Sequence, residues 1–258
     1  MYNFIKNIIN RVLLKFRLKI IRLNNSLSLI NEKELISFDR DSFNHKLYIE
    51  GLKISKNEKS ENFFKKSRFL DLINLVELTL EKNDVDDFVE AGCWFGHSSY
   101  IIASIIKKSS KKNINFHIFD SFEGLSEVTE SDRDLSKLDK NDVLKIRSQF
   151  KSNEVFVKKE VLGNFDFVKI YKGWIPEKFN LVEDKKFSFV HIDVDLYKPT
   201  LDTLEFFYPK LSKGGIILCD DYNSKGFDGA KEACDKYFRD KDYSFKFSPS
   251  VSGFFVIK

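Results

Sequence analysis

The pattern of apolar and polar residues becomes regular after about residue 87. Short apolar runs then alternate with stretches whose apolar residues recur at helical spacing. The apolar runs predict strands at 87–91, 114–119, 167–171, 187–192, 215–219, 243–247 and 253–257. The stretches between them predict helices at 97–109, 141–151, 174–182, 198–212 and 226–239. This alternation predicts an α/β fold with a doubly wound, Rossmann-like sheet.

The last two predicted strands differ from the others in their connection. Only the short segment "SPSVS" separates them, which leaves no room for a crossover helix. We therefore expect an antiparallel C-terminal hairpin at one edge of an otherwise parallel sheet. The long polar segment 125–142 lies between a predicted strand and a predicted helix, and it is interpreted either as a mobile lid or as a plain surface loop.

The chain before residue 87 contains two further helical patterns. Residues 2–24 place apolar residues on one face and basic residues along its flank, and residues 60–82 form the second pattern. The basic amphipathic helix at 2–24 is expected either to dock on the body or another subunit, or to lie on an anionic membrane surface. Residues 25–58 are mixed and polar. We expect an N-terminal helical extension over 1–58 and one catalytic domain over 59–258.

Composition and charge narrow the class of protein. The chain has 258 residues, of which 42% are hydrophobic and 32% charged, as is typical of a globular protein with a full core. Of the formal net charge of +4, residues 1–24 supply +6, so the remainder carries −2. A body so close to neutral argues against nucleic-acid binding. The three cysteines lack metal-binding spacing and predict reduced thiols in a cytoplasmic protein.

The first strand of the regular part leads into a glycine turn, "VEAGCWFGHSS". Gly92 allows the backbone to approach a ligand closely, and the helix that follows begins with unpaired N–H groups. The carboxylate of Glu90 at the strand end would repel a phosphate but attract a sulfonium or ammonium group. The spacing is not the dinucleotide fingerprint, so the turn favours S-adenosylmethionine over NAD.

The next predicted strand ends at Asp120, in "INFHIFDSFEGL". A carboxylate at this place in such a sheet is suited to accept hydrogen bonds from two ribose hydroxyls. The sharp turn that follows predicts that Ser121 and Phe122 flank the adenine. The alternative is that Asp120 only caps a turn.

Two acidic clusters follow strands of the same predicted sheet: Asp193 and Asp195 in "HIDVDLY", and Asp220 and Asp221 in "LCDDY". Because parallel strands end at one edge of a sheet, the four carboxylates are expected to converge. Hard oxygen ligands suit Mg²⁺ or a similar divalent ion. We assign Asp193, Asp220 and Asp221 as metal ligands and Asp195 as general base. His97 and His191 are interpreted as structural.

Together these motifs resemble the macrocin O-methyltransferase family (TylF/MycF-like), enzymes that methylate sugar hydroxyls with S-adenosylmethionine and Mg²⁺. The resemblance rests on "VEAGCWFGHSS", "IFDSFEGL", "YKGWIPE" and "HIDVDLYKPTLDTLEFFYPKLSKGGIILCDDY". It implies the same metal ligands and the same base. It also implies a cofactor site lined by Glu90, Gly92, Ser98, Asp120, Ser121, Gly173 and Trp174.

The resemblance implies a sugar, nucleotide-sugar or glycan as substrate, and we expect a homo-oligomer in the cytoplasm, with peripheral membrane contact through residues 2–24 as an option. Two other classes stay open at this point. One is a metal-dependent glycosyltransferase that uses the "DVD" motif to hold a nucleotide-sugar diphosphate. The other is a non-catalytic module with a methyltransferase-like fold.

Overall fold

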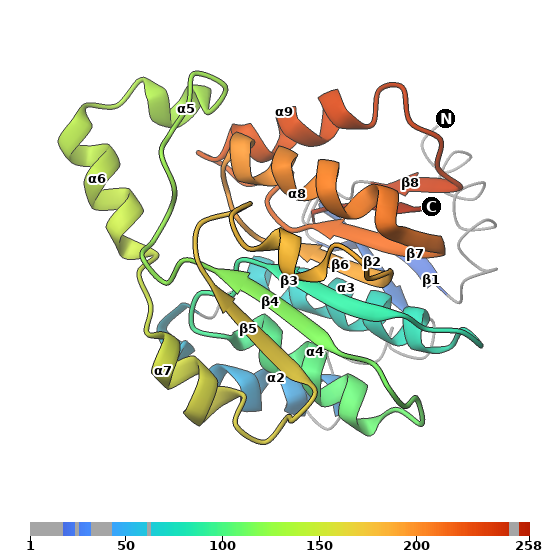
Figure 1. Cartoon of the computed structure of the whole chain (residues 1–258). Coiled ribbons are helices and arrows are strands. Elements are labelled where there is room, and N and C mark those ends of the chain that lie inside the picture. The colour runs from blue at the N-terminus through green and yellow to red at the C-terminus, as the bar shows by residue number, and fades with distance from the viewer. Residues whose placement is uncertain (1–17, 24–25, 32–42, 61–62, 248–252) are drawn as a thin grey trace.

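The computed structural model describes residues 18–23, 26–31, 43–60, 63–247 and 253–258. Its centre is a seven-stranded sheet in the order β5-β4-β3-β6-β7-β9-β8 (Figure 1). The strands are β3 (Asp87–Ala91), β4 (Phe116–Asp120), β5 (Val168–Lys172), β6 (Phe187–Ile192), β7 (Leu211–Cys219), β8 (Phe245–Phe247) and β9 (Phe254–Ile257). The doubly wound α/β fold and all seven predicted strands are confirmed.

Strand direction follows from the connections. The neighbours from β5 to β7 are parallel, whereas β9 pairs antiparallel with both β7 and β8. The predicted antiparallel C-terminal hairpin is therefore confirmed. Its second strand, β9, lies next to β7, and its first strand, β8, forms the edge of the sheet. Because the parallel strands all end at one edge, the polar residues that follow β3, β4, β6 and β7 are brought together there.

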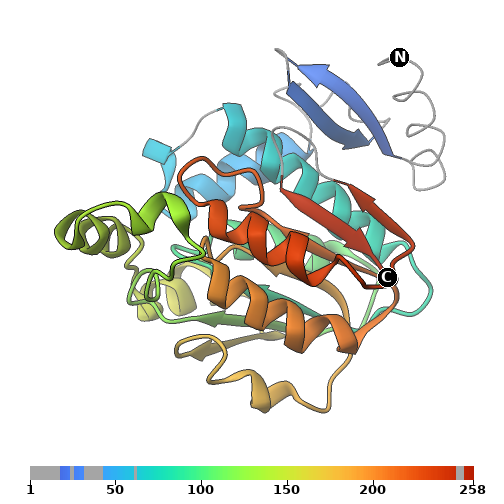
Figure 2. The ribbon, with the colours of Figure 1, turned by 90° about the horizontal axis from the view of Figure 1, so that it is seen from above.

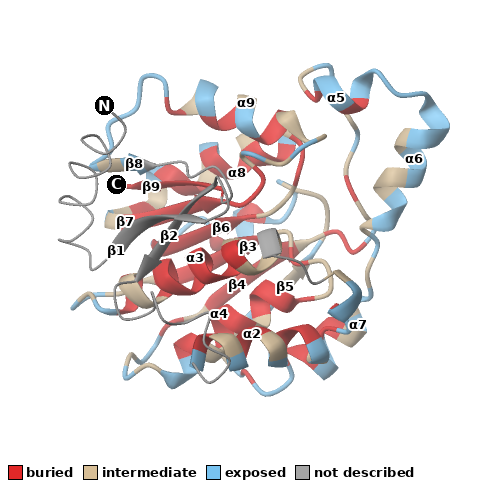
Figure 3. Cartoon of the chain, turned by 180° about the vertical axis from the view of Figure 1, so that it is seen from behind, coloured by how far each residue is buried: buried red, intermediate tan, exposed pale blue. Residues whose placement is uncertain are grey.

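Helices cover both faces of the sheet. One layer holds α2 (Phe43–Ile54), α3 (Phe63–Leu80) and α4 (His97–Lys108), and the other holds α8 (Tyr197–Lys210) and α9 (Asp228–Tyr237). Figure 2 shows the second layer from above, and Figure 3 shows the buried faces of α3 and α4 against the strands. None of the described helices has the length and apolar character needed to cross a bilayer.

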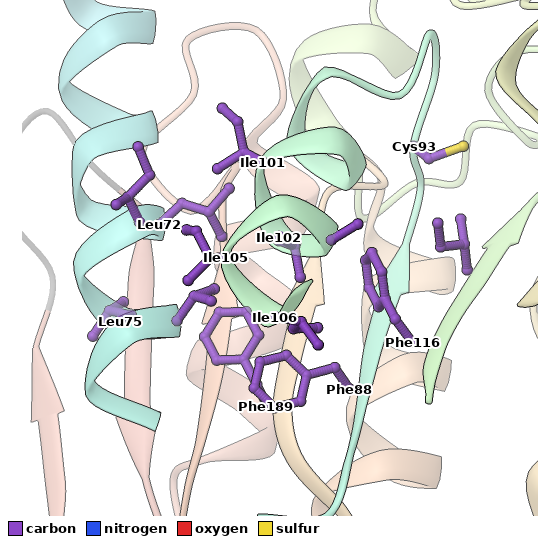
Figure 4. Close-up of a cluster of buried hydrophobic side chains, with 14 of the residues drawn as sticks. Leu72, Leu75, Phe88, Cys93, Ile101, Ile102, Ile105, Ile106, Phe116 and Phe189 are labelled. Atoms are coloured by element: carbon purple, nitrogen blue, oxygen red, sulfur yellow. The ribbon is translucent and has the colours of Figure 1, made fainter. Parts of the chain in front are cut away.

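The core of the first layer is built from large apolar side chains. Leu72 and Leu75 of α3 face Ile105 of α4, and Phe88 and Phe189 of the sheet lie beneath them (Figure 4). Each of these side chains is at most 5% exposed. Complete burial of such a side chain contributes about 1.5–3 kcal/mol, so this layer fixes α3 and α4 firmly on the sheet.

The N-terminal part departs from the prediction of a helix over 2–24. Residues Leu18–Leu23 form β1, which pairs antiparallel with β2 (Ser26–Asn31), so the predicted helix is wrong over 18–23. The segment "LKIIRL" contains adjacent β-branched isoleucines and fits strand as well as helical periodicity, and "SLSLIN" offers a partner in which polar and apolar residues alternate over 26–29. Residues 2–17 lie outside the described residues.

Three other helices also differ from the prediction. No helical period is evident in the sequence of α2, yet its Leu47, Tyr48 and Leu52 are buried in the core; the division of the chain at residue 58 stays a prediction. The predicted helix 174–182 is wrong over 174–178, because Pro176 interrupts it and only the 3₁₀ turn η4 (Phe179–Val182) forms. An unpredicted helix, α7 (Glu154–Phe156), continues into the π-helical η3 (Val157–Val161).

The long polar segment after β4 is partly helical. It contains α5 (Arg133–Ser136) and runs into α6 (Lys140–Gln149), and both helices project from the body in Figure 1. We call residues 125–149 the arm. Asp132 anchors the arm, because its Oδ1 accepts a hydrogen bond of 2.7 Å from Tyr197 N at the start of α8. The arm is thus an anchored element with its own helices rather than a plain loop.

Candidate active site

A cavity of about 910 Å³ opens at the edge where the parallel strands end. Most of the predicted site residues line it: Gly92, Ser98, Asp120, Ser121, Trp174, Asp193, Asp195, Asp220 and Asp221. Glu90 and Gly173 are not among the lining residues. Side chains of α3 and of the arm complete the walls. The motifs that follow β3, β4, β6 and β7 therefore face one space.

Gly92 brings the turn after β3 against the end of β6. Its φ is +84°, and a Cβ placed there would lie 1.9 Å from the carbonyl oxygen of Asp193. Asp193 N in turn donates a hydrogen bond of 2.8 Å to Ala91 O. Only glycine allows this approach, so the glycine turn and the first acidic cluster are held together by backbone contacts.

Glu90 lies beneath the turn rather than in the cavity wall. It is fully buried, accepts a hydrogen bond from Ser99 Oγ, and its Oε1 lies 3.0 Å from His191 Nδ1. Burial alone would lower the pKa of His191, but the hydrogen bond and charge of Glu90 raise it to about 9. The pair therefore ties β3 to β6 below the floor of the cavity.

Asp120 fixes the geometry of two turns. Its Oδ2 accepts hydrogen bonds from Cys93 N (2.7 Å) and Trp94 N (3.0 Å), and its Oδ1 accepts one from Phe122 N (2.6 Å). Oδ2 already accepts two hydrogen bonds, whereas Oδ1 accepts one and keeps a second lone pair, so Asp120 can still accept from a ligand hydroxyl in the cavity through Oδ1. Asp120 does cap turns, as the alternative interpretation held, and it also faces the cavity.

The remaining predicted cofactor residues lie around the end of β4. Ser121 Oγ accepts a hydrogen bond from Glu123 N (3.0 Å) and donates one to Gly124 O (3.2 Å), which shapes the turn after the strand. Gly173 N donates to Asp120 O (3.1 Å), so it supports the site from outside the lining. Trp174 follows directly and lines the cavity, whereas Ser98 lines it from the first turn of α4.

The four aspartates converge as predicted; Asp195, Asp220 and Asp221 are at least 91% buried, and Asp193 is partly buried. Asp195 has a left-handed φ of +60°, and its N–H donates a hydrogen bond of 2.9 Å to Asp221 Oδ2. Burial, and then the neighbouring carboxylates, raise the pKa values of Asp193, Asp195 and Asp221. So many buried carboxylates in one place require positive charge nearby.

A possible ligand set at this edge includes a residue that the sequence did not suggest. One atom each of His191, Asp193 and Asp220 lie within 4.8 Å of one another. His191 was interpreted as structural, and its bond to Glu90 agrees with that role, but it also lies next to the cluster. No sequence motif marks it, because its position depends on how β3 and β6 pair.

A sequence profile of the macrocin-O-methyltransferase (TylF) family matches residues 14–245. The chain belongs to this family. The resemblance of the motifs is thereby confirmed, and membership in the macrocin-O-methyltransferase family favours methyl transfer over the glycosyltransferase alternative.

Two curated relatives are O-methyltransferases of Streptomyces. The 8-demethyl-8-(2,3-dimethoxy-alpha-L-rhamnosyl)-tetracenomycin-C 4'-O-methyltransferase of Streptomyces olivaceus is 30% identical over 167 residues, which cover 63% of this chain and 61% of the relative. The demethyldecarbamoylnovobiocin O-methyltransferase of Streptomyces niveus is 28% identical over 173 residues, covering 63% and 62%. The match thus spans less than two thirds of either relative.

Solved structures share the fold. The O-methyltransferase NovP aligns with a TM-score of 0.60 and 24% identity over 73% of this chain and 78% of its own. The calicheamicin methyltransferase CalS11 aligns with a TM-score of 0.57 and 17% identity over 86% and 96%. At these identities the likeness shows a common methyltransferase fold.

Three lining residues have features that the sequence motifs do not show. Arg68 of α3 forms an ion pair with Asp220, and the charge of Asp220 raises the pKa of the guanidinium despite burial. Trp94 has an indole N–H that is buried without a hydrogen-bond partner, and so is Nδ1 of His97. Their roles depend on tertiary packing, so only the structure reveals them.

His97 is held as a neutral acceptor. Its Nε2 lies 3.1 Å from Tyr48 O and therefore carries the proton, which leaves a lone pair on Nδ1. The ring stacks on Phe69 with a centroid distance of 4.2 Å. Burial, with a further contribution from the charge of Lys65, lowers the pKa of His97 to about 3.

Proposed function

We propose that the chain is an S-adenosylmethionine-dependent O-methyltransferase that transfers a methyl group to a hydroxyl of a sugar or glycoside. The observation that carries the proposal is the contact between Gly92 and the Asp193 carbonyl, which places a cofactor-type turn and an acidic cluster in one cavity. Family membership and the names of the two relatives, which act on glycosylated natural products, support the same chemistry.

The cavity offers groups that suit the cofactor. Asp120 faces it with the remaining lone pair of Oδ1 for a ribose hydroxyl, and the first turn of α4 presents Ser98 and backbone N–H groups. The unpartnered Trp94 Nε1–H and His97 Nδ1 are a donor and an acceptor next to that turn. A buried polar atom without a partner is costly, so a ligand that satisfies these atoms gains affinity.

The acidic cluster suits a divalent cation. Asp193, Asp220 and Asp221 are the residues that would hold it, since all three are carboxylates that follow the neighbouring strands β6 and β7 and line the cavity. When bound, a cation such as Mg²⁺ supplies Lewis acidity that lowers the pKa of a sugar hydroxyl. His191 lies next to Asp193 and Asp220, but Glu90 raises its pKa to about 9, so its protonated ring has no lone pair to offer and it is not among the residues that would hold the cation.

Asp195 is placed to act as the general base. Its backbone N–H is fixed by Asp221, and its left-handed φ holds the side chain at the cavity wall. In the proposed step its carboxylate takes the proton of the substrate hydroxyl while the oxygen forms a bond to the methyl carbon. The bond from that carbon to sulfur breaks, and the electron pair leaves with the sulfur as S-adenosylhomocysteine.

The test is methyl transfer to defined sugars. The chain is incubated with S-adenosylmethionine, Mg²⁺ and a panel of nucleotide sugars and glycosides, and products are analysed by mass spectrometry for the gain of one CH₂. We expect EDTA to stop the reaction and Asp195→Asn to lower kcat by about 10²–10⁴-fold, with cofactor affinity retained. The control Asp184→Asn changes an exposed carboxylate and should keep full activity.

Three outcomes would count against parts of this proposal. Absence of any methylated sugar across the panel would argue against the substrate class. Full activity in EDTA would refute the cation, and an Asp195→Asn variant with normal kcat would refute the base. Assembly into a homo-oligomer and membrane contact through residues 2–24 stay predictions.

A further inference from the structure

Arg68 is a cavity-lining cation that comes from outside the methyltransferase motifs. It lies on α3, which packs against α4 and the sheet, and it reaches the strand ends from that layer. Its guanidinium contacts Asp220 Oδ2, and the two side chains are 26% and 6% exposed. The contact therefore joins a partly open cation to one of the most buried carboxylates of the site.

The charge around this contact is strongly negative. Asp195, Asp220 and Asp221 are buried and Asp193 is partly buried, and each of the four carboxylates adds to the negative field at the Arg68 guanidinium. A buried carboxylate needs a cation or several hydrogen-bond donors to offset its lost hydration. Arg68 meets this need at Oδ2 of Asp220, so a divalent cation held by this carboxylate would have to share it with the guanidinium.

We propose that Arg68 competes with the divalent cation for Asp220, so that binding of the cation moves the guanidinium off this carboxylate and into the cavity. The inference rests on the cation site of the proposed function. Arg68 thereby holds the acidic cluster together until the cation arrives. Afterwards its planar donors face the space in which a substrate binds.

In the alternative role, Arg68 only orients Asp220 as a ligand. Removal of Arg68 would then weaken cation binding instead of tightening it. An orienting partner strengthens metal binding, typically by about 10–100-fold. Repulsion between a guanidinium and a doubly charged ion only a few ångströms apart outweighs that gain, even at an effective dielectric constant of about 20. Competition therefore predicts that removal of the Arg68 charge tightens cation binding.

The experiment is a calorimetric titration of the full chain with Mn²⁺ in the absence of substrate. The variants are Arg68→Gln, which removes the charge, and Arg68→Lys, which keeps it. Arg133→Gln is the matched control, because Arg133 pairs with Asp228 and Glu232 on α9 and does not line the cavity. Circular dichroism and thermal unfolding check that each variant is folded.

We expect Arg68→Gln to bind Mn²⁺ about tenfold more tightly or better, and Arg68→Lys and Arg133→Gln to stay close to the wild type. Addition of Mn²⁺ should also raise the unfolding temperature of Arg68→Gln more than that of the wild type. If Arg68→Gln does not fold, the charge-neutral Arg68→Met takes its place.

Unchanged or weaker binding in Arg68→Gln, with normal binding in the wild type, would overturn the competition and leave the proposed function intact. Equal tightening in Arg68→Lys would also overturn it, because charge would then not be the cause. Absence of Mn²⁺ binding in the wild type and in every variant would instead refute the cation site itself, and the competition with it.

Discussion

At the scale of single residues, the site depends on a few positions where the backbone takes a left-handed conformation. Gly92, Trp94, Phe122 and Asp195 all have positive φ and all lie at strand ends around the cavity. Such conformations cost about 1–3 kcal/mol each for residues other than glycine, so the surrounding packing must hold them. The strain is concentrated where the motifs meet.

Gly92→Ala tests the closest of these contacts. The added Cβ would lie 1.9 Å from Asp193 O, so the ends of β3 and β6 must separate. We expect the free energy of unfolding to fall by clearly more than the 1–2 kcal/mol that a left-handed φ alone costs, with loss of S-adenosylhomocysteine binding. The matched control is Gly226→Ala, where φ is also +84° but no atom lies within 4 Å of the added Cβ.

Urea unfolding and calorimetry measure both effects. Equal destabilisation of the two variants would mean that the approach of Asp193 to the turn is not as tight as described. Normal ligand affinity in Gly92→Ala would mean that the cofactor binds elsewhere.

His97 predicts a pH dependence of stability. Its pKa is about 3 in the folded chain and near 6.5 when unfolded, so the unfolded state binds more protons between these values. Its contribution to stability is complete above pH 6.5 and is lost as the pH falls, with a slope of up to about 1.4 kcal/mol per pH unit. His97→Phe keeps the stacking on Phe69 and removes the titration.

Urea unfolding of both proteins from pH 4 to 8 measures the difference in slope. The wild type should lose more stability than His97→Phe below pH 6.5, and the difference should be constant above pH 7. Parallel curves over the whole range would show that His97 is not held neutral.

At the scale of elements, strands were easier to predict than helices. The strands β3 and β6 are buried on both faces, so apolar residues predominate in both sequences and do not merely alternate with polar ones. In α2, by contrast, Asn44 and Gly51 are buried beside Leu47 and Leu52, and these residues hide the apolar stripe. For α7, the signal was the Asn153 cap, whose side chain accepts from Phe156 N.

The arm allows a prediction about one element. Asp132 is buried and bonds Thr129 N, Thr129 Oγ1 and Tyr197 N, so Asp132→Ala frees the arm from α8. We expect faster amide hydrogen exchange across residues 129–149 with little change in the sheet. The control Asp139→Ala removes only the exposed cap of α6, so its effect should be confined to the first turn of that helix.

Mass spectrometry of exchange in short peptides resolves the two variants. An Asp132→Ala chain whose arm exchanges at the wild-type rate would show that other contacts, such as the pairs of Arg133 with α9, hold the arm in place.

At the scale of the whole molecule, the sequence predicts where the site lies better than it predicts which residues line it. The four aspartates and the glycine turn could be located because strand order puts their strand ends at one edge. Arg68 could not be found in this way, because it reaches the cavity through the packing of α3. Trp94 and His97 lie within the glycine-turn motif, but the sequence does not show that a polar atom of each is buried at the cavity without a hydrogen-bond partner.

The site also predicts how the body unfolds. The cavity is lined by residues at the ends of β3, β4, β6 and β7 and by side chains of α3. A ligand there therefore contacts the sheet against which both helical layers pack. S-adenosylhomocysteine at 100 times its dissociation constant should stabilise the fold by about 2.7 kcal/mol and raise a single thermal transition by about 5–10 °C. Two transitions, of which only one shifts, would mean that the layers unfold independently.

The three backbone hydrogen bonds to Asp120 have a consequence for interpreting affinity data. Replacing this carboxylate with alanine deletes the acceptors that shape two loops as well as any partner for a ribose. The measured loss would therefore overstate the sugar contact. A double-mutant cycle that pairs Asp120→Ala with a deoxyribose analogue of the ligand separates the two contributions, and the larger share should belong to the loops.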